Sequence, residues 1–189
     1  MARIGRTGQS FYGQGGRVDL GAEAWYFMGR SSPVMTAPHP IWRRDDGFVV
    51  TTDPFQFQVG EIHAFLTRSY WAEGIPLAIV EASIRGSIAF ALLDSEGRQV
   101  GFARAITDGA TFAYLADVYV LEELRGRGLG TFLMACVKGH PSLQGLRRWA
   151  LVTRDAHALY RRFGFEALAR PEGWMEKTDP EIYRRKEAT

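Results

Sequence analysis

The sequence contains a single cysteine, Cys136, among its 189 residues. A lone cysteine excludes an internal disulfide, and the four histidines form no cluster with metal-ligand spacing. The chain also lacks an apolar run long enough to span a bilayer, and its first residues lack the apolar core of a signal peptide. We therefore expect a cytoplasmic protein that holds no metal and does not enter a membrane.

A large excess of either charge is also lacking, because the formal net charge is only +2. Lysine occurs only at Lys138, Lys177 and Lys186, so most of the positive charge comes from arginines scattered along the chain. Scattered arginines without interleaved aromatic side chains do not form the basic surface that nucleic acid requires, and we expect no nucleic-acid partner. The 46% of hydrophobic residues is ample for a packed core, and the length fits one domain with or without a tail.

Residues 1–40 differ in composition from the rest of the chain. They are rich in glycine, and their last ten residues, SSPVMTAPHP, add three prolines. This composition interrupts helical and strand patterns and predicts a flexible extension, followed by one domain over residues 41–189. Met35 stands just before the ordered pattern, so one hypothesis is that the natural chain starts there. The alternative is that the aromatic residues 25–27 anchor a short docking segment.

From residue 48 onward, hydrophobic periodicity divides the chain into strand and helix segments. Glycine or proline lies at several of the boundaries between these segments. The predicted strands cover 48–53, 87–94, 99–107, 111–121, 147–153, 165–170 and 174–177, and the predicted helices cover 60–73, 77–84, 129–138 and 155–164. The order is one strand, two helices, three strands, a helix, a strand, a helix and a closing strand pair.

The stretch LRGRGLGTF at residues 124–132 links the end of a strand to an amphipathic helix. The first amides of a helix lack internal partners and the helix dipole favours negative charge there, while glycines let the backbone approach a bulky anion. Arg125 and Arg127 would add charge-assisted hydrogen bonds. The stretch matches neither the dinucleotide fingerprint nor the P-loop. Taken alone, it fits a pyrophosphate site and a glycine-rich turn with solvated arginines equally well.

Two motifs in a defined order change that balance. The first is Arg125, Gly128 and Gly130 after a Val-x-Val strand at Val118 and Val120, and the second is Ala156, Tyr160, Gly164 and Phe165. In this order and spacing they resemble the GNAT superfamily of acyl-CoA-dependent N-acyltransferases, over residues 48–176. The resemblance implies an α/β (α+β) fold with a mixed, mostly antiparallel central sheet flanked by helices.

The resemblance also implies a binding site for acetyl-CoA as co-substrate. The helix start and the loop before it would hold the pyrophosphate, and the preceding strand would bind the pantetheine arm through its backbone. The residues expected to bind the cofactor are Val118, Tyr119, Val120, Arg125, Gly126, Arg127, Gly128, Leu129, Gly130, Thr131 and Thr153. Thr153 stands where many relatives carry an asparagine, so a side-chain contact there is in doubt.

Tyr160 and Asp117 are the expected catalytic residues. Tyr160 matches the family's usual general acid, which protonates the departing sulfur; its other interpretation is an aromatic side chain packed in a helical stripe. Asp117 lies within the apolar strand YLADVYV, where a carboxylate is costly without a partner. Its resemblance to relatives that act on polyamines implies a base or an amine anchor. Its other interpretations are exposure to solvent or a salt bridge with an arginine such as Arg104.

The acceptor site is less defined by the sequence. Tyr70 and Trp71 fall in the connection between the first two predicted helices, where the family places substrate contacts, although ordinary packing explains them equally. Arg104 would favour an acceptor with a carboxylate, and His157 lies one turn before Tyr160. The expected function is transfer of an acetyl group from acetyl-CoA to a primary amine of a small molecule. A CoA-binding regulatory module without catalysis, a protein or peptide N-acetyltransferase, and a homodimeric assembly stay open.

Overall fold

The computed structural model describes residues 39–183. The hypotheses on Met35 and on residues 25–27 fall outside this range, as does nearly all of the extension predicted over residues 1–40. The boundary between that extension and the domain therefore stays a prediction. Everything below concerns the described residues.

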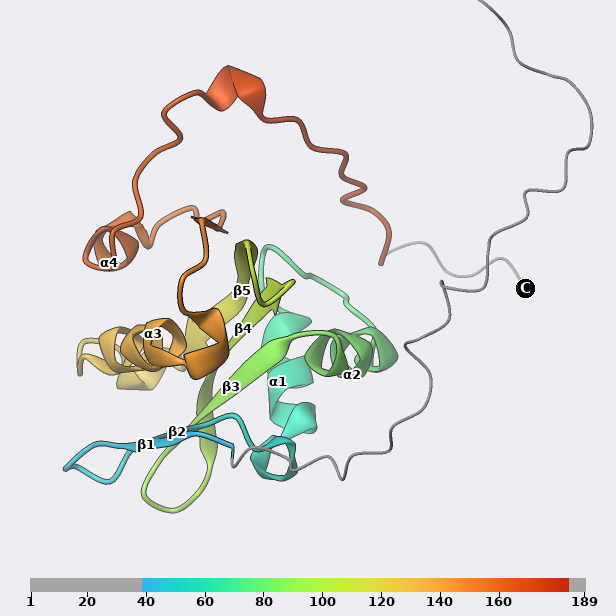
Figure 1. Ribbon diagram of the computed structural model, residues 1–189. Coiled ribbons are helices and arrows are strands. Elements are labelled where there is room, and N and C mark those ends of the chain that lie inside the picture. Colours follow the sequence, from blue (N-terminus) through green and yellow to red (C-terminus); the bar gives the residue numbers. More distant parts are fainter. Residues whose placement is uncertain (1–38, 184–189) are drawn as a thin grey trace, which may run out of the picture. The chain divides into compact units, whose positions relative to one another are not determined.

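The centre of the fold is a six-stranded sheet whose strands follow one another in chain order (Figure 1). The strands are β1 (Ile41–Arg43), β2 (Val49–Thr51), β3 (Ile88–Leu93), β4 (Gln99–Thr107), β5 (Phe112–Val120) and β6 (Arg148–Ala150). Neighbouring strands are antiparallel from β1 to β5, and β6 alone pairs parallel with β5. The mixed, mostly antiparallel sheet predicted from the family resemblance is confirmed.

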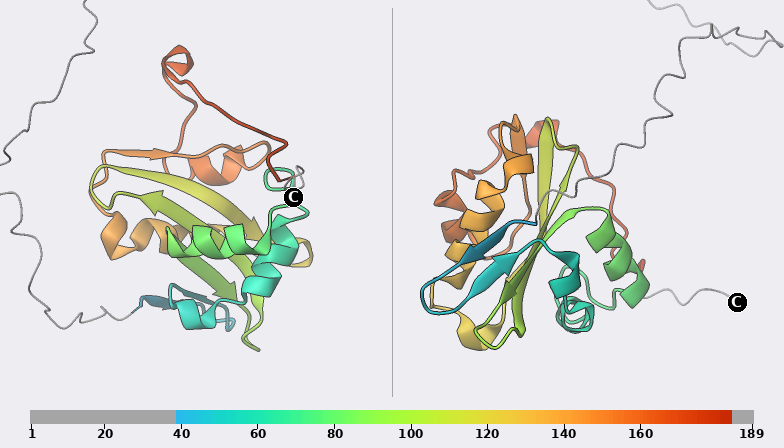
Figure 2. Two further views of the ribbon diagram at one scale, coloured as in Figure 1. Left: turned by 90° about the vertical axis from the view of Figure 1, so that its right-hand side faces the viewer. Right: turned by 60° about the horizontal axis from the view of Figure 1, so that its bottom comes forward.

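Helices cover both faces of this sheet. They are α1 (Val59–Leu66), α2 (Leu77–Arg85), α3 (Leu129–Gly139) and α4 (His157–Arg161). Figures 1 and 2 show α1 and α2 together on one face and α3 on the opposite face. Each helix except the short α4 presents an apolar stripe, and the sheet offers an apolar surface on each side, so two layers of helices enclose it.

The two faces of the sheet form two separate hydrophobic clusters. The larger one joins α3 and α4 to the sheet, with Phe90, Leu133 and Met134 fully buried. The smaller one joins α1 and α2 to the other face around Ile62 and Phe102. Alternation of side chains along each strand sends successive residues to opposite clusters, and this explains the continuously buried run of β3.

Several predicted boundaries were wrong. The helix predicted over 60–73 ends at Leu66. Beyond it, the Ser69 hydroxyl donates to the Leu66 carbonyl and the Gly74 amide donates to the Thr67 carbonyl, and these bonds compete with further helical turns. The strand β1 was not predicted. The closing strand pair predicted over 165–170 and 174–177 is absent from the described structure. Residues 165–177 instead contain a 3-10 turn at Pro171–Gly173. Those residues are mostly exposed, so no buried face stabilises strands there.

Candidate active site

A cleft opens where β5 and β6 separate. The two strands pair only between Phe112 and Tyr114 on β5, and the rest of β5 has no strand partner on that side among residues 39–183. The cleft has a volume of about 920 Å³. It is lined by residues from the end of β5, the loop and first turn of α3, the start of α4 and the connection between α1 and α2. The end of β5 and the start of α3 are continuous in the chain, so three segments distant in sequence meet at one cavity.

A β-bulge shapes this end of β5. The register between β4 and β5 shifts between Phe102 and Arg104, so one extra residue is inserted into β5. Asp117 takes up the insertion with φ of 53°, a left-handed backbone that costs free energy for any residue with a side chain. Past the bulge, Gly101 lets β4 approach β5 closely, because a Cβ there would lie 2.8 Å from the Tyr119 carbonyl oxygen.

The start of α3, Gly128–Thr131, forms one wall of the cleft, and we call this segment the cradle. Gly128 precedes the helix with φ of 75° and accepts the first helical hydrogen bond from the Phe132 amide at 3.0 Å. The amides of Leu129, Gly130 and Thr131 belong to the first turn, which lacks partners within a helix, and all three residues line the cleft. No acidic residue occupies this turn, so the positive end of the helix dipole is not neutralised.

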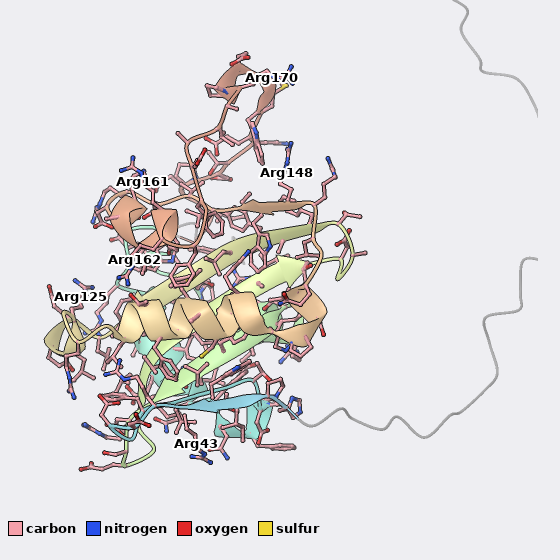
Figure 3. All side chains as sticks on the ribbon, turned by 60° about the vertical axis from the view of Figure 1, so that its left-hand side comes forward. Arg43, Arg125, Arg148, Arg161, Arg162 and Arg170 are labelled. Atoms are coloured by element: carbon pink, nitrogen blue, oxygen red, sulfur yellow. The ribbon has the colours of Figure 1, made fainter. Side chains whose placement is uncertain are left out.

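Arginines surround the cradle unequally. Arg125 lines the cleft, and its side chain is 59% exposed and only loosely paired with Glu122, at 3.5 Å. Arg162 reaches over from α4 and donates to the Thr131 hydroxyl at 3.1 Å, and Figure 3 shows both arginines near the end of α3 where the helix begins. Arg127 instead lies over the Phe48 ring, outside the lining of the cleft. Arg125 and Arg162 therefore lie beside the cradle, and Arg44, which is paired with Asp46, also approaches Gly128.

Tyr160 lines the same cleft as the cradle. It lies in α4, is 8% exposed, and packs edge-on against Phe165 at a centroid distance of 5.9 Å. Burial, with smaller contributions from Tyr70 and Asp155, raises the pKa of the Tyr160 phenol to about 12. The phenol therefore keeps its proton at physiological pH and lines the same cleft as the cradle.

Two of the four acceptor residues named from the sequence line the cleft, at the α1–α2 connection, and we call this part of the cleft the acceptor end. Tyr70 and Trp71 line it, and the indole Nε1 of Trp71 donates to Asp117 Oδ1 at 3.1 Å. The other carboxylate oxygen of Asp117 forms an ion pair with Arg104, so the salt bridge considered from the sequence is present. Both side chains are largely buried, and neither lines the cleft directly. Trp71 thus stands between Asp117 and the cavity.

Two other candidates lie outside the lining of the cleft. Thr153 accepts a hydrogen bond from the Ala156 amide at 3.1 Å and so supports the turn into α4. His157 is the first residue of α4 and is exposed. Their expected roles stay predictions without support from contact with the cavity.

The structure adds lining residues that sequence reasoning missed. Phe65, Arg68 and Arg154 line the cleft. Arg162 lies outside the lining and donates a hydrogen bond to the lining residue Thr131. Helical periodicity marked Phe65 only as an apolar position. Nothing in the local sequence brings Arg154 beside Tyr70, because the contact joins residues 84 positions apart.

Other reactive groups do not form a second site in the described part of the chain. Cys136 is buried on α3, and burial raises the pKa of its thiol to about 12, so it stays protonated and unreactive. Between residues 39 and 183, no group of three or more His, Cys, Asp or Glu side chains is placed to hold a metal ion. Over the same range, no helix has the length and apolar character needed to cross a bilayer.

Known proteins with similar sequences and structures agree with this geometry. A model of the acetyltransferase (GNAT) domain matches residues 85–167. The protein FG08082 of Gibberella zeae, named as a proposed acetyltransferase, is 36% identical over 141 residues, which are 63% of this chain and 78% of that protein. A crystal structure from Xanthomonas campestris pv. campestris, described as a proposed acetyltransferase of the GNAT family, is 48% identical, with a TM-score of 0.70 over 73% of this chain and 97% of its own.

A more distant structure, from Deinococcus radiodurans, supports the fold alone, with 19% identity and a TM-score of 0.59 over 75% of this chain and 95% of its own. The splayed sheet, with a glycine-led helix at its opening, is the architecture of an acetyltransferase domain. Given the matches at 36% and 48% identity, the chain belongs to the GNAT family of acetyltransferases.

Proposed function

We propose that this protein is an N-acetyltransferase that moves an acetyl group from acetyl-CoA to a primary amine of a small molecule. The observation that carries the proposal is that the cradle at Gly128–Thr131 and the protonated phenol of Tyr160 line one cleft. A phosphate-bearing acyl donor and a proton for its leaving group would therefore meet in the same cavity.

The described residues fit acetyl-CoA. The first-turn amides of α3, together with Arg125 and Arg162, suit a pyrophosphate because they combine aligned N–H groups with guanidinium charge. The backbone of residues 118–120 borders the cleft without a strand partner on its β6 side, which suits an extended pantetheine arm. Acetyl-CoA would supply the activated acetyl thioester, with the acyl carbon accepting the amine and the sulfur leaving as a thiol.

Tyr160 would hold the proton that the departing sulfur takes up. A phenol with a raised pKa keeps this proton on Oη until the sulfur acquires charge. The amine must reach the acyl carbon uncharged, although a free alkylammonium has a pKa near ~10, so a proton has to leave it first. Asp117 is our candidate for receiving that proton or anchoring the amine, and its contact with the cavity would pass through Trp71 or need the indole to move.

A thiol-release assay with acetyl-CoA and a panel of primary amines tests the proposal, with Tyr160→Phe as the diagnostic variant. We expect kcat to fall by about 10²-fold or more, the usual contribution of a positioned acid, while the Kd for acetyl-CoA stays unchanged. Phenylalanine keeps the ring that packs against Phe165 and removes only the hydroxyl that carries the proton.

Three other results would point elsewhere. Acetyl-CoA binding without turnover for any amine would favour a regulatory module. Turnover with peptides alone would favour a peptide N-acetyltransferase. Full activity of Tyr160→Phe would remove the phenol from the mechanism.

A further inference from the structure

The acceptor end of the cleft is walled by a chain of aromatic rings. Tyr119 stacks on Phe65 with a centroid distance of 3.6 Å and an interplanar angle of 8°. Phe65 contacts Trp71 at 6.3 Å, and Trp71 meets Tyr70 edge-on at 4.9 Å. Tyr119 is buried, whereas Trp71 and Tyr70 remain 42% and 50% exposed while lining the cavity. We call Phe65, Tyr70, Trp71 and Tyr119 the aromatic wall.

The polar atoms of the two exposed rings already form hydrogen bonds within the protein. Trp71 Nε1 donates to Asp117, and the Tyr70 hydroxyl accepts from the Arg154 amide at 3.2 Å. The wall therefore joins β5, the α1–α2 connection and the loop before α4. Because these bonds already fix both side chains, a ligand stacking on them loses little rotamer freedom from the protein. What the wall offers to an acceptor is chiefly apolar ring surface.

Charged side chains of both signs lie around the aromatic wall. The guanidinium of Arg154 lies 3.9 Å from the Tyr70 ring centroid and is loosely paired with Asp155 at 3.6 Å. Arg68 also lines the cleft, and within residues 39–183 no carboxylate lies within ion-pair distance of it. Asp117 is neutralised by Arg104 behind Trp71. Glu122, Glu123 and Asp155 line the cleft together with these arginines, so charge alone does not select the acceptor.

From the aromatic wall, we propose that the acceptor is a primary amine whose body is an aromatic ring. This rests on the proposed acetyltransferase function and assigns the substrate class of the same site. The ring stacks on Trp71 and Tyr70, while the amine points toward Tyr160. An anionic substituent on the acceptor is accommodated beside Arg68. Trp71 becomes the residue that determines specificity.

A matched set of acceptors tests the substrate class: 2-phenylethylamine, phenylalanine, n-hexylamine and spermidine. Calorimetric titration of the full-length protein measures their binding, and thiol release with saturating acetyl-CoA measures turnover. We expect 2-phenylethylamine and phenylalanine to bind about threefold to tenfold more tightly than hexylamine, the range that aromatic pairing adds beyond area burial. Spermidine, which has no ring to stack on the aromatic wall, should also bind more weakly than 2-phenylethylamine.

Substitutions at Trp71 separate ring stacking from its hydrogen bond. Trp71→Leu removes the ring and should abolish the preference for 2-phenylethylamine over hexylamine. Trp71→Phe keeps a ring without the Nε1 donor and should retain most of that preference. The matched control is Phe55→Leu, which changes an aromatic side chain 93% exposed outside the cleft and should leave both amines unaffected. The Kd for acetyl-CoA should be the same in all three variants and serves as the check on folding.

The failure of this inference is distinguishable from failure of the proposed function. Efficient acetylation of hexylamine or spermidine, at or above the rate for 2-phenylethylamine, would overturn the aromatic acceptor and leave the acetyltransferase standing. So would a Trp71→Leu variant that lowers the affinity for every amine equally. Acetyl-CoA binding with no turnover of any amine would instead defeat the proposed function.

Discussion

Two glycines at the start of α3 differ in what they require of the backbone. Gly128 has φ of 75°, which costs a residue with a Cβ about 1–2 kcal/mol, whereas Gly130 is helical and an added Cβ would meet Leu159 at an ordinary 3.5 Å. We predict that Gly128→Ala lowers the free energy of unfolding by about that amount and weakens acetyl-CoA binding. Gly130→Ala is the matched control and should change both little.

Urea denaturation and calorimetric titration with acetyl-CoA measure the two quantities. Equal losses of affinity in Gly128→Ala and Gly130→Ala would mean that the cradle depends on the absence of any side chain in the first turn. In that case the left-handed backbone at Gly128 would not be the feature that binds the anion.

Asp117 combines a strained backbone, an ion pair and a hydrogen bond to the aromatic wall. Asp117→Asn can keep an acceptor for Trp71 Nε1 but leaves the largely buried guanidinium of Arg104 without its partner. We predict a loss of about 3 kcal/mol in the free energy of unfolding, typical of breaking such a pair, and a loss of about 10²-fold in turnover if the carboxylate handles the proton.

The double variant Asp117→Asn/Arg104→Gln separates these two effects. Removing both charges should recover much of the stability, as measured by urea denaturation, while turnover at a temperature where all variants are folded stays low. If turnover returned together with stability, Asp117 would serve only to hold Trp71 and the bulge.

At the scale of elements, the unpaired edge of β5 is the feature that the cofactor would complete. β5 pairs with β6 only up to Tyr114, so amides beyond it that point toward β6 have no strand partner. We predict that saturating acetyl-CoA slows hydrogen exchange of amides within residues 118–120, because a pantetheine arm would pair with them. Amides of β3, which is paired on both sides, should exchange at the same slow rate with and without acetyl-CoA.

Exchange measured by mass spectrometry on peptides covering the two strands provides the comparison. Protection confined to α3, with none in β5, would indicate that the ligand is held by its phosphates alone. That outcome would leave the helix start as the anion site but would contradict the role of β5.

The elements that the sequence predicted well are those with a strong periodic signal and a local stop. The hairpin of β3 and β4 is bounded by a left-handed Gly97, and α3 begins directly after Gly128, so both were predicted within one or two residues. The helix predicted over 60–73 was too long because side-chain and turn hydrogen bonds compete with the helix after Leu66. Apolar alternation after residue 165 did not form strands, because burial and not the pattern alone stabilises a strand.

Across the whole molecule, the predicted site residues fall into those named for backbone geometry and those named for side-chain chemistry. The former, along β5 and the start of α3, line the cleft because strand and helix positions follow from the sequence pattern. The latter depend on contacts between distant segments, which no local pattern contains. The salt bridge of Asp117 with Arg104 was one interpretation considered from the sequence, but the hydrogen bond from Trp71 to Asp117 and the contact of Arg162 with Thr131 had no signal there.

The cleft is bordered by residues packed against both hydrophobic clusters, so a ligand bound there should stabilise the folded domain as one unit. Phe65 packs against one cluster, whereas Leu159 packs against the other, and both line the cleft. A ligand that binds only the folded state, at 100 times its Kd, adds about 2.7 kcal/mol to the free energy of unfolding. For a chain of this size, we predict that acetyl-CoA at that concentration raises the Tm by roughly 5–10 °C.

Differential scanning calorimetry with and without acetyl-CoA measures this shift. Gly128→Ala, scanned at the same ligand concentration, is the control, and its shift should be smaller because fewer molecules of ligand are bound near the transition. A wild-type thermogram that splits on adding ligand, with only one component moving, would show that the two clusters unfold separately and that the cleft does not couple them. A single transition that moves as a whole would place the binding energy in the stability of the entire domain.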